Sequence, residues 1–253
     1  MHIDAVLGSF VVTLSRVAGT VSWIPIPGMR SALDPSRILL AVSLTLVLSP
    51  AWPGAPAGGW TAGTILAAVT ADALYGIASG LVVAFLLEGF LVAAQAVGLQ
   101  AGLSFASTID PTSQADSPAL LVLMQWTAGL LFLAAGLHHE VIRAIALSLR
   151  TAPPGAVISW LREPEFVWAL GSSMLTLGVR LSLPVVALLL FADLALALMS
   201  RIQPQLQLLS LAFPVKTLAA LLLLAASASV APALFERAAG PSVAALYRLA
   251  HGN

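Results

Sequence analysis

The feature that most constrains this chain is a succession of eight apolar runs, each poor in charged residues. The runs cover Ala5–Ile24, Ile38–Leu48, Ala62–Leu87, Gly89–Ile109, Ala119–Leu137, Val141–Leu161, Phe166–Ala192 and Leu206–Phe235. A helix needs about 20 mostly apolar residues to cross a bilayer, so most of these runs are long enough to span one. The second run is too short to cross alone, because Pro50 and Pro53 oppose its extension. We expect it to form a hairpin arm with the first run.

The overall composition excludes several classes of protein. Of the 253 residues, 59% are apolar and only 9% are charged, whereas soluble domains carry about 25% charged residues. Basic and acidic residues balance at 11 each, which leaves no basic footprint for a nucleic acid. The chain has no cysteine, so disulfides, thiolate zinc sites and iron–sulfur ligation are excluded. We predict an all-α polytopic membrane protein of six to eight apolar, kinked helices in one domain over residues 1–253.

Six charged residues lie inside or at the edge of apolar runs: Arg16, Asp72, Glu88, Arg180, Asp193 and Lys216. A charge at the centre of a span costs about 2.5–3.5 kcal/mol. We therefore expect these side chains to pair with one another, to line a wet cavity, or to lie outside the hydrocarbon. An ion or proton path is the alternative to structural pairing. Asp193 and Arg201 share one helical face but lie two turns apart, so each is expected to pair elsewhere.

Small residues recur every four positions at Ala94, Gly98 and Gly102. This spacing predicts a helix face that a neighbouring backbone can approach closely. Gln95 and Gln100 flank the face and require polar partners in a dry interior. Pro184 and Pro214 lie within apolar runs and are expected to kink or break their helices.

Motifs that would indicate catalysis are absent from the sequence. There is no phosphate-binding loop, no nucleophile elbow and no His-Glu-x-x-His pair of zinc ligands. His138 and His139 are adjacent, and adjacent helical side chains point about 100° apart, which does not favour sharing one ion. We interpret them as an interfacial pair, and we predict no enzyme activity, no metal and no cofactor.

The chain also carries an ordered series of polar, glycine and proline residues along most of its length. The series comprises Arg16, Pro25, Gly28, Pro35, Arg37, Pro50, Glu88-Gly89-Phe90, Gln95, Gly98, Gln100–Leu103, Asp110-Pro111, Leu131–Leu133, Gly136–His138, Ser148, Pro154-Gly155, Pro184, Asp193-Leu194, Arg201–Gln205 and Pro214–Lys216. It resembles the FliR family of flagellar export-gate proteins. Its most specific part is the spacing of Asp193, Arg201, Pro204 and Gln205. One departure is Ala135, where the family commonly has a glycine before Gly136.

The resemblance implies a structural subunit of the flagellar type III export gate in the bacterial inner membrane, at the flagellar basal body. In the family this subunit joins FliP-like and FliQ-like subunits in a helical assembly, beside an FlhB-like subunit. Bent helical hairpins form a channel there for unfolded flagellar export substrates. A virulence injectisome subunit of the SctT type is the alternative within this class. A secondary transporter is the more remote one, since no internal repeat is evident.

The resemblance further implies that a loop around Ser104–Pro118 plugs the closed channel. Within it the gate residues are Ser104, Phe105, Asp110, Pro111, Thr112, Ser113 and Gln114. A loop of this composition tolerates water beside rigid apolar helices, and a solvated turn between two helices is the alternative. The residues expected to have structural polar or kinking roles are Glu88, Gln95, Gln100, Asp193, Arg201, Pro204, Gln205 and Lys216.

Overall fold

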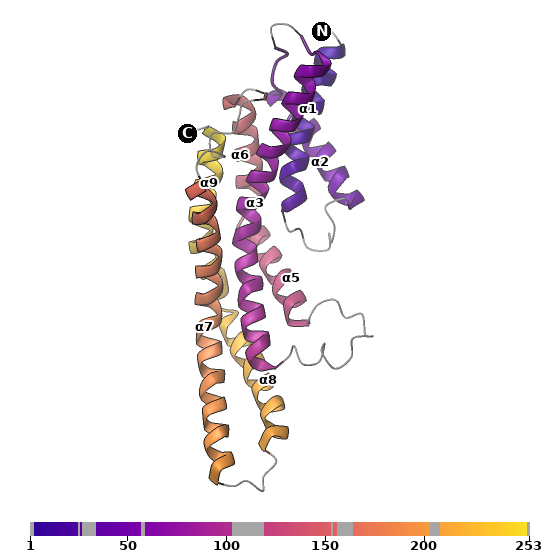
Figure 1. Ribbon diagram of the computed structural model, residues 1–253. Helices are drawn as coiled ribbons and strands as arrows, with labels where there is room; N and C mark the ends of the chain where they lie inside the picture. The colour runs from indigo at the N-terminus through magenta and orange to yellow at the C-terminus, as the bar shows by residue number, and fades with distance from the viewer. Residues whose placement is uncertain are drawn as a thin grey trace. The chain divides into compact units, whose positions relative to one another are not determined.

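A computed structural model describes residues 3–24, 26, 34–56, 59–102, 119–152, 154–155, 164–202 and 208–251. Within these ranges every regular secondary-structure element is a helix (Figure 1). The elements are α1 (Ile3–Trp23), α2 (Pro35–Val47), the 3₁₀ turn η1 (Ser49–Ala51), α3 (Ala62–Ala101), α5 (Ala119–Ala134), α6 (Leu137–Thr151), α7 (Pro164–Ile202), α8 (Leu208–Ser227) and α9 (Ala231–His251). The predicted all-α fold and helix number are thus confirmed for the described residues.

Two apolar runs that the sequence separates at Glu88 form one continuous helix, α3, of 40 residues. Glutamate is a good helix former, so a single charge changes the hydropathy of the run without ending the helix. At a rise of 1.5 Å per residue, α3 is about 60 Å long, roughly twice the thickness of the hydrocarbon core. Helix α7, with 39 residues, is of similar length. Part of each helix must therefore lie outside the hydrocarbon.

Among the residues that the structure describes, three helices are long and apolar enough to cross a membrane: Asp4–Trp23, Ala62–Ala101 and Trp168–Arg201. Two bent helix pairs raise the number to as many as five, and the pair α5–α6 is bent by 64°. The bend lies at Gly136, whose φ of 70° is a left-handed conformation that glycine adopts without steric cost. The chain is a polytopic membrane protein.

Helices α7 and α8 continue through Pro184 and Pro214, so the expected breaks do not occur there. Proline removes one backbone hydrogen bond from a helix, but tertiary neighbours can hold the remaining turns in place. Whether either helix is kinked remains a prediction.

The chain divides into two compact units. Unit 1 comprises Met1–Leu86, Phe132–Gly171 and Ala239–Asn253, and unit 2 comprises Leu87–Leu131 and Ser172–Ala238. The helices α3, α5, α7 and α9 each contribute residues to both units.

In unit 1, α1 and α2 lie side by side as an antiparallel hairpin (Figure 1), which confirms the predicted hairpin arm. The Arg37 guanidinium donates hydrogen bonds to the carbonyl oxygens of Val21 (2.7 Å) and Ser22 (2.8 Å) at the end of α1. Burial lowers the pKa of this guanidinium from its ordinary value, and the Asp34 carboxylate opposes the shift. At the other end of the hairpin, the ring centroids of Phe10 and Trp52 lie 5.7 Å apart.

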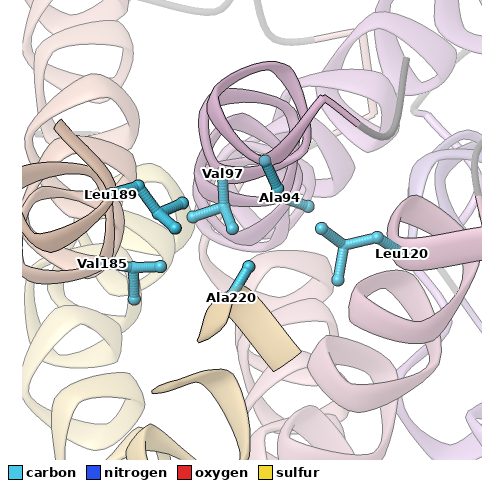
Figure 2. Close-up of a cluster of buried hydrophobic side chains, with 7 residues drawn as sticks. Ala94, Val97, Leu120, Val185, Leu189 and Ala220 are labelled. Atoms are coloured by element: carbon cyan, nitrogen blue, oxygen red, sulfur yellow. The ribbon is translucent and has the colours of Figure 1, made fainter. Parts of the chain in front are cut away.

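In unit 2, residues from four helices converge on one hydrophobic cluster, which we call the unit 2 core (Figure 2). It comprises Ala94, Val97 and Ala101 of α3, Leu120 of α5, Val185 and Leu189 of α7, and Ala220 of α8. Leu189 and Ala101 are completely buried. The core therefore joins the end of α3, the start of α5 and the middle parts of α7 and α8.

Candidate functional site

A polar cluster from three helices lies in unit 2, at the level where α3 ends. The Asp193 carboxylate of α7 accepts a hydrogen bond from Gln100 Nε2 of α3 at 2.9 Å. The same carboxylate pairs with Lys216 Nζ of α8, at 2.8 Å from Oδ1 and 2.9 Å from Oδ2. We call these three residues the Asp193 cluster. It neutralises one acid and one base that would otherwise be costly among apolar helices.

The unit 2 core contains residues from both sides of the segment 103–118. Before the segment, Ala101 is buried in the unit 2 core and Gly102 turns the chain out of α3 with a φ of 79°. The Thr217 hydroxyl, next to Lys216, donates a hydrogen bond to the Ala101 carbonyl at 3.5 Å. After the segment, Leu120 enters the same core, with 5% of its surface exposed. The unit 2 core therefore holds the residues that flank this segment on both sides, and the Asp193 cluster lies next to Ala101, on the first side.

The expected plug residues Ser104, Phe105, Asp110, Pro111, Thr112, Ser113 and Gln114 lie outside the described residues, as do Pro204 and Gln205. Of the other polar residues, Gln100, Asp193 and Lys216 are brought together. Glu88, Gln95 and Arg201 are exposed and are not part of the cluster. The expected pairing of Asp193 with a residue other than Arg201 is confirmed.

The three small residues of α3 have different surroundings. Ala94 belongs to the unit 2 core, and Gly102 forms the turn after the helix. A Cβ on Gly98 would meet only the Leu120 Cδ2 atom among the described residues, at 3.8 Å. Close backbone approach occurs instead where a Cβ on Gly19 would lie 2.7 Å from the Ala73 carbonyl oxygen, in unit 1.

A second polar cluster, in unit 1, was not among the expected site residues. Arg16 of α1 forms an ion pair with Asp72 of α3, and their side chains are only 3% and 1% exposed. Arg16 Nη1 donates a hydrogen bond to the Ser148 hydroxyl at 3.2 Å, and its guanidinium lies 4.6 Å from the centroid of the Tyr75 ring. The Gly155 amide donates to Asp72 Oδ2 at 3.3 Å. We call these five residues the Arg16 network.

Sequence alone offered a partial signal for this network. Arg16 and Asp72 are charged residues inside apolar runs. Ser148 and Gly155 belong to the ordered series of residues that resembles the FliR family. Only tertiary structure pairs them, because Arg16 and Asp72 are 56 residues apart and Ser148 is 132 residues from Arg16.

The adjacent histidines of α6 also lie in unit 1. The centroids of their two rings are 4.0 Å apart. The next residue, Glu140, accepts hydrogen bonds from Tyr247 (2.7 Å) and Arg143 (2.9 Å). No group of three or more His, Cys, Asp or Glu side chains that could hold a metal ion occurs among the described residues.

The fold and its two polar clusters define a polytopic helical membrane protein that buries charge between helices. Residues 7–240 match the family of bacterial export proteins, family 1, so the chain belongs to that family. It is 33% identical to the flagellar biosynthetic protein FliR of Escherichia coli (strain K12), over 84% of this chain and 81% of that protein. It is also similar to the FliR proteins of Caulobacter vibrioides (29% identical, 80% and 82% covered) and Bacillus subtilis (26%, 88% and 86%). The resemblance to the FliR family is thus confirmed, and neither the family description nor these names denote an enzyme.

Proposed function

We propose that this chain is a structural subunit of the flagellar type III export gate, in the bacterial inner membrane at the flagellar basal body. It forms the channel for unfolded flagellar proteins together with FliP-like and FliQ-like subunits, beside an FlhB-like subunit. The observation that supports this proposal most strongly is the match to a bacterial export family over residues 7–240, with relatives named as flagellar proteins. Those names also favour the flagellar over the injectisome alternative.

The need for partner subunits is supported by the exposed apolar surface. In the most apolar window of α7 only 17% of the residues are buried, against 61% in α3. Both helices exceed the thickness of the hydrocarbon core by about 30 Å, so lipid cannot cover all of their exposed surface. On α3 the exposed residues Glu88, Gln95 and Leu99 follow one another at spacings of seven and four, which places them on one face. Such a mixed polar and apolar face suits contact with another protein.

Co-expression tests the assembly. The subunit produced alone is expected to be of low stability in detergent and to aggregate progressively, whereas co-expression with its FliP-like and FliQ-like neighbours is expected to yield one stable complex. Size-exclusion chromatography with subunit-specific detection measures both results. A stable monomer that does not co-purify with those subunits would overturn the assembly proposal.

The segment around Ser104–Pro118 is proposed to plug the closed channel. This is supported by the rigid attachment of both its ends, through Ala101 and Leu120, to the unit 2 core. A plug must be held at its base by a structure that does not move when the loop does.

Deletion of Thr112–Gln114 tests the plug. We expect cells to become permeable to ions and small solutes while the complex still assembles, measured as dye uptake and as co-purification. The matched control removes three exposed residues of another interhelical connection, Gly54–Pro56, and is expected to leave permeability unchanged. Equal permeability in both deletions and the parent would count against the plug and would leave the assembly proposal intact.

A further inference from the structure

The chain that leaves α6 in unit 1 has few backbone donors of its own. Ala152 is followed by Pro153 and Pro154, and proline has no N–H to donate to a carbonyl oxygen. Gly155 is therefore the first residue after Ala152 that offers a backbone donor. The last carbonyl groups of a helix need donors from outside the helix, so the end of α6 depends on water or on other parts of the chain.

The two charges of the Arg16 network bond the backbone on both sides of these prolines. Arg16 Nη2, from α1, donates a hydrogen bond to the Ala152 carbonyl oxygen at 3.5 Å. The Asp72 carboxylate, from α3, accepts the hydrogen bond of the Gly155 amide at 3.3 Å. The buried ion pair between α1 and α3 thus holds the connection after α6 at two points.

The hydrogen bonds of the pair are divided between the helices and the connection. Asp72 Oδ1 accepts from the Arg16 guanidinium, whereas Asp72 Oδ2 accepts from the Gly155 amide. Arg16 Nη1 donates to the Ser148 hydroxyl of α6 at 3.2 Å. One ion pair therefore bonds to α6 and to the connection that follows it, which two apolar side chains could not do.

Gly155 also rests directly on the backbone of α3. Its φ of 77° is a left-handed conformation that glycine adopts without steric cost. A Cβ on Gly155 would lie 3.6 Å from the Ala68 Cα, and Ala68 is one helical turn before Asp72. A hydrogen bond and a backbone contact therefore hold the connection to the same part of α3.

Stability alone does not explain why charged residues occupy this buried site. Apolar replacement of a buried ion pair is often neutral or stabilising, so hydrocarbon side chains could join α1 and α3 equally well. What the charges add is hydrogen bonding to a connection that contains two consecutive prolines. Polar groups that are fully paired in an apolar interior can specify one arrangement of the chain among several.

We propose that the Arg16 network is a clamp that fixes the course of the chain after α6. Arg16 and Asp72 are positioning residues that hold Ala152 and Gly155 against α3. They give unit 1 no more stability than apolar side chains of similar volume would give. This role goes beyond the export function and does not depend on the plug.

Hydrogen exchange can test the clamp at a single amide. Because Pro153 and Pro154 carry no N–H, peptides that end at Ala152 and at Gly155 differ in deuterium uptake only by the Gly155 amide. Mass spectrometry measures this difference in the detergent-solubilised complex, or in the subunit if it purifies alone. The reference is the amide of Gly54, an exposed residue between α2 and α3.

The unmodified protein provides the first comparison. Gly54 and Gly155 both follow a proline, so their intrinsic exchange rates are matched, and Gly54 is likewise isolated by peptides that end on either side of Pro53. We expect Gly155 to exchange at least about tenfold more slowly than Gly54, because its exchange requires local opening of the clamp. Equal rates would overturn the proposal without any substitution.

The double variant Arg16→Met with Asp72→Leu provides the second comparison. We expect its thermal midpoint to stay close to that of the parent, while exchange at Gly155 rises to the rate of Gly54. Continued protection of Gly155 in this variant would overturn the clamp. A loss of folding alone would not produce the expected result, because the midpoint and the local exchange rate are measured separately.

Thr45→Val is the matched control in unit 1. Thr45 is completely buried, and its hydroxyl donates a hydrogen bond to the Ala41 carbonyl oxygen within α2. We expect Gly155 to remain protected in this variant, and a loss of protection equal to that of the double variant would contradict a specific clamp. None of these outcomes bears on the export-gate proposal, which co-purification tests separately.

Discussion

The two polar clusters pair oppositely charged side chains in contrasting surroundings. In unit 1, Arg16 and Asp72 are 3% and 1% exposed, and their remaining polar atoms meet further partners in the Arg16 network. In unit 2, Lys216 and Asp193 are 16% and 40% exposed, and Gln100 is the further partner. The first pair is enclosed by this chain alone, whereas the second lies at a helix junction that remains partly open.

The same contrast extends to the packing of helices. In unit 1, α1 and α3 approach so closely at Gly19 and Gly76 that backbone meets backbone. In unit 2, most of the α7 surface is exposed and apolar. Unit 1 thus pairs its buried Arg16 and Asp72 in a closely packed setting, while the ion pair and the α7 surface of unit 2 are more exposed. If this comparison is correct, substitutions should destabilise the isolated subunit more strongly in unit 1 than in unit 2.

The largest effect is expected from Asp72→Asn. Arginine cannot be deprotonated in proteins, so the change leaves the buried Arg16 guanidinium without its counter-charge. Removing one partner of a buried ion pair costs about 3–5 kcal/mol. We expect little folded subunit to be recovered, measured as the yield and thermal midpoint of the detergent-solubilised protein.

A double variant, Arg16→Met with Asp72→Leu, shows whether the instability comes from the unpaired charge or from any substitution at these two positions. Apolar replacement of both partners of a buried pair is often neutral or stabilising, so the double variant should recover most of the lost stability. Equal losses in the single and double variants would contradict the role given to the pair.

The next effect is expected from Gly76→Ala. The added Cβ would lie 2.9 Å from the Arg16 carbonyl carbon and 3.0 Å from the Gly19 Cα. These are backbone atoms that cannot rotate away, so α1 and α3 must separate. Overpacking of this kind costs about 1–3 kcal/mol, and we expect the upper end of that range. Thermal unfolding of the solubilised subunit measures it, and an unchanged midpoint would show that the α1–α3 contact is looser than described.

These two sites also show what sequence could and could not establish. Apolar runs predicted the all-α membrane fold and the α1–α2 hairpin because length and hydropathy are local properties. Arg16 and Asp72 were recognised as requiring partners, but their pairing depends on how α1 and α3 pack over a separation of 56 residues. Close approach of a helix to the face of Gly98 and Gly102 stays a prediction, whereas the tightest backbone contacts of α3 among the described residues lie at Gly76. The spacing of glycines indicates that another helix backbone can approach closely, but the position of that contact depends on how the neighbouring helix packs.

A smaller effect is expected from Lys216→Met in unit 2. Asp193 keeps its hydrogen bond from Gln100, and its carboxylate is 40% exposed, so the loss should be about 1–2 kcal/mol. The thermal midpoint should fall less than in Asp72→Asn, and Lys216→Arg should restore it. A fall as large as that of Asp72→Asn would remove the distinction between the two clusters.

The smallest effect is expected from Gly98→Ala. The new methyl group would meet Leu120 Cδ2 at 3.8 Å, an ordinary van der Waals contact, and alanine is favoured over glycine in a helix interior by about 1 kcal/mol. We therefore expect the isolated subunit to be unchanged or more stable by up to about 1 kcal/mol, whereas Gly76→Ala is destabilising. Thermal unfolding of the subunit and of the assembled complex should be compared. A loss confined to the complex would mean that a partner helix packs on Gly98, which is the close contact that the glycine spacing predicts and the chain alone does not provide.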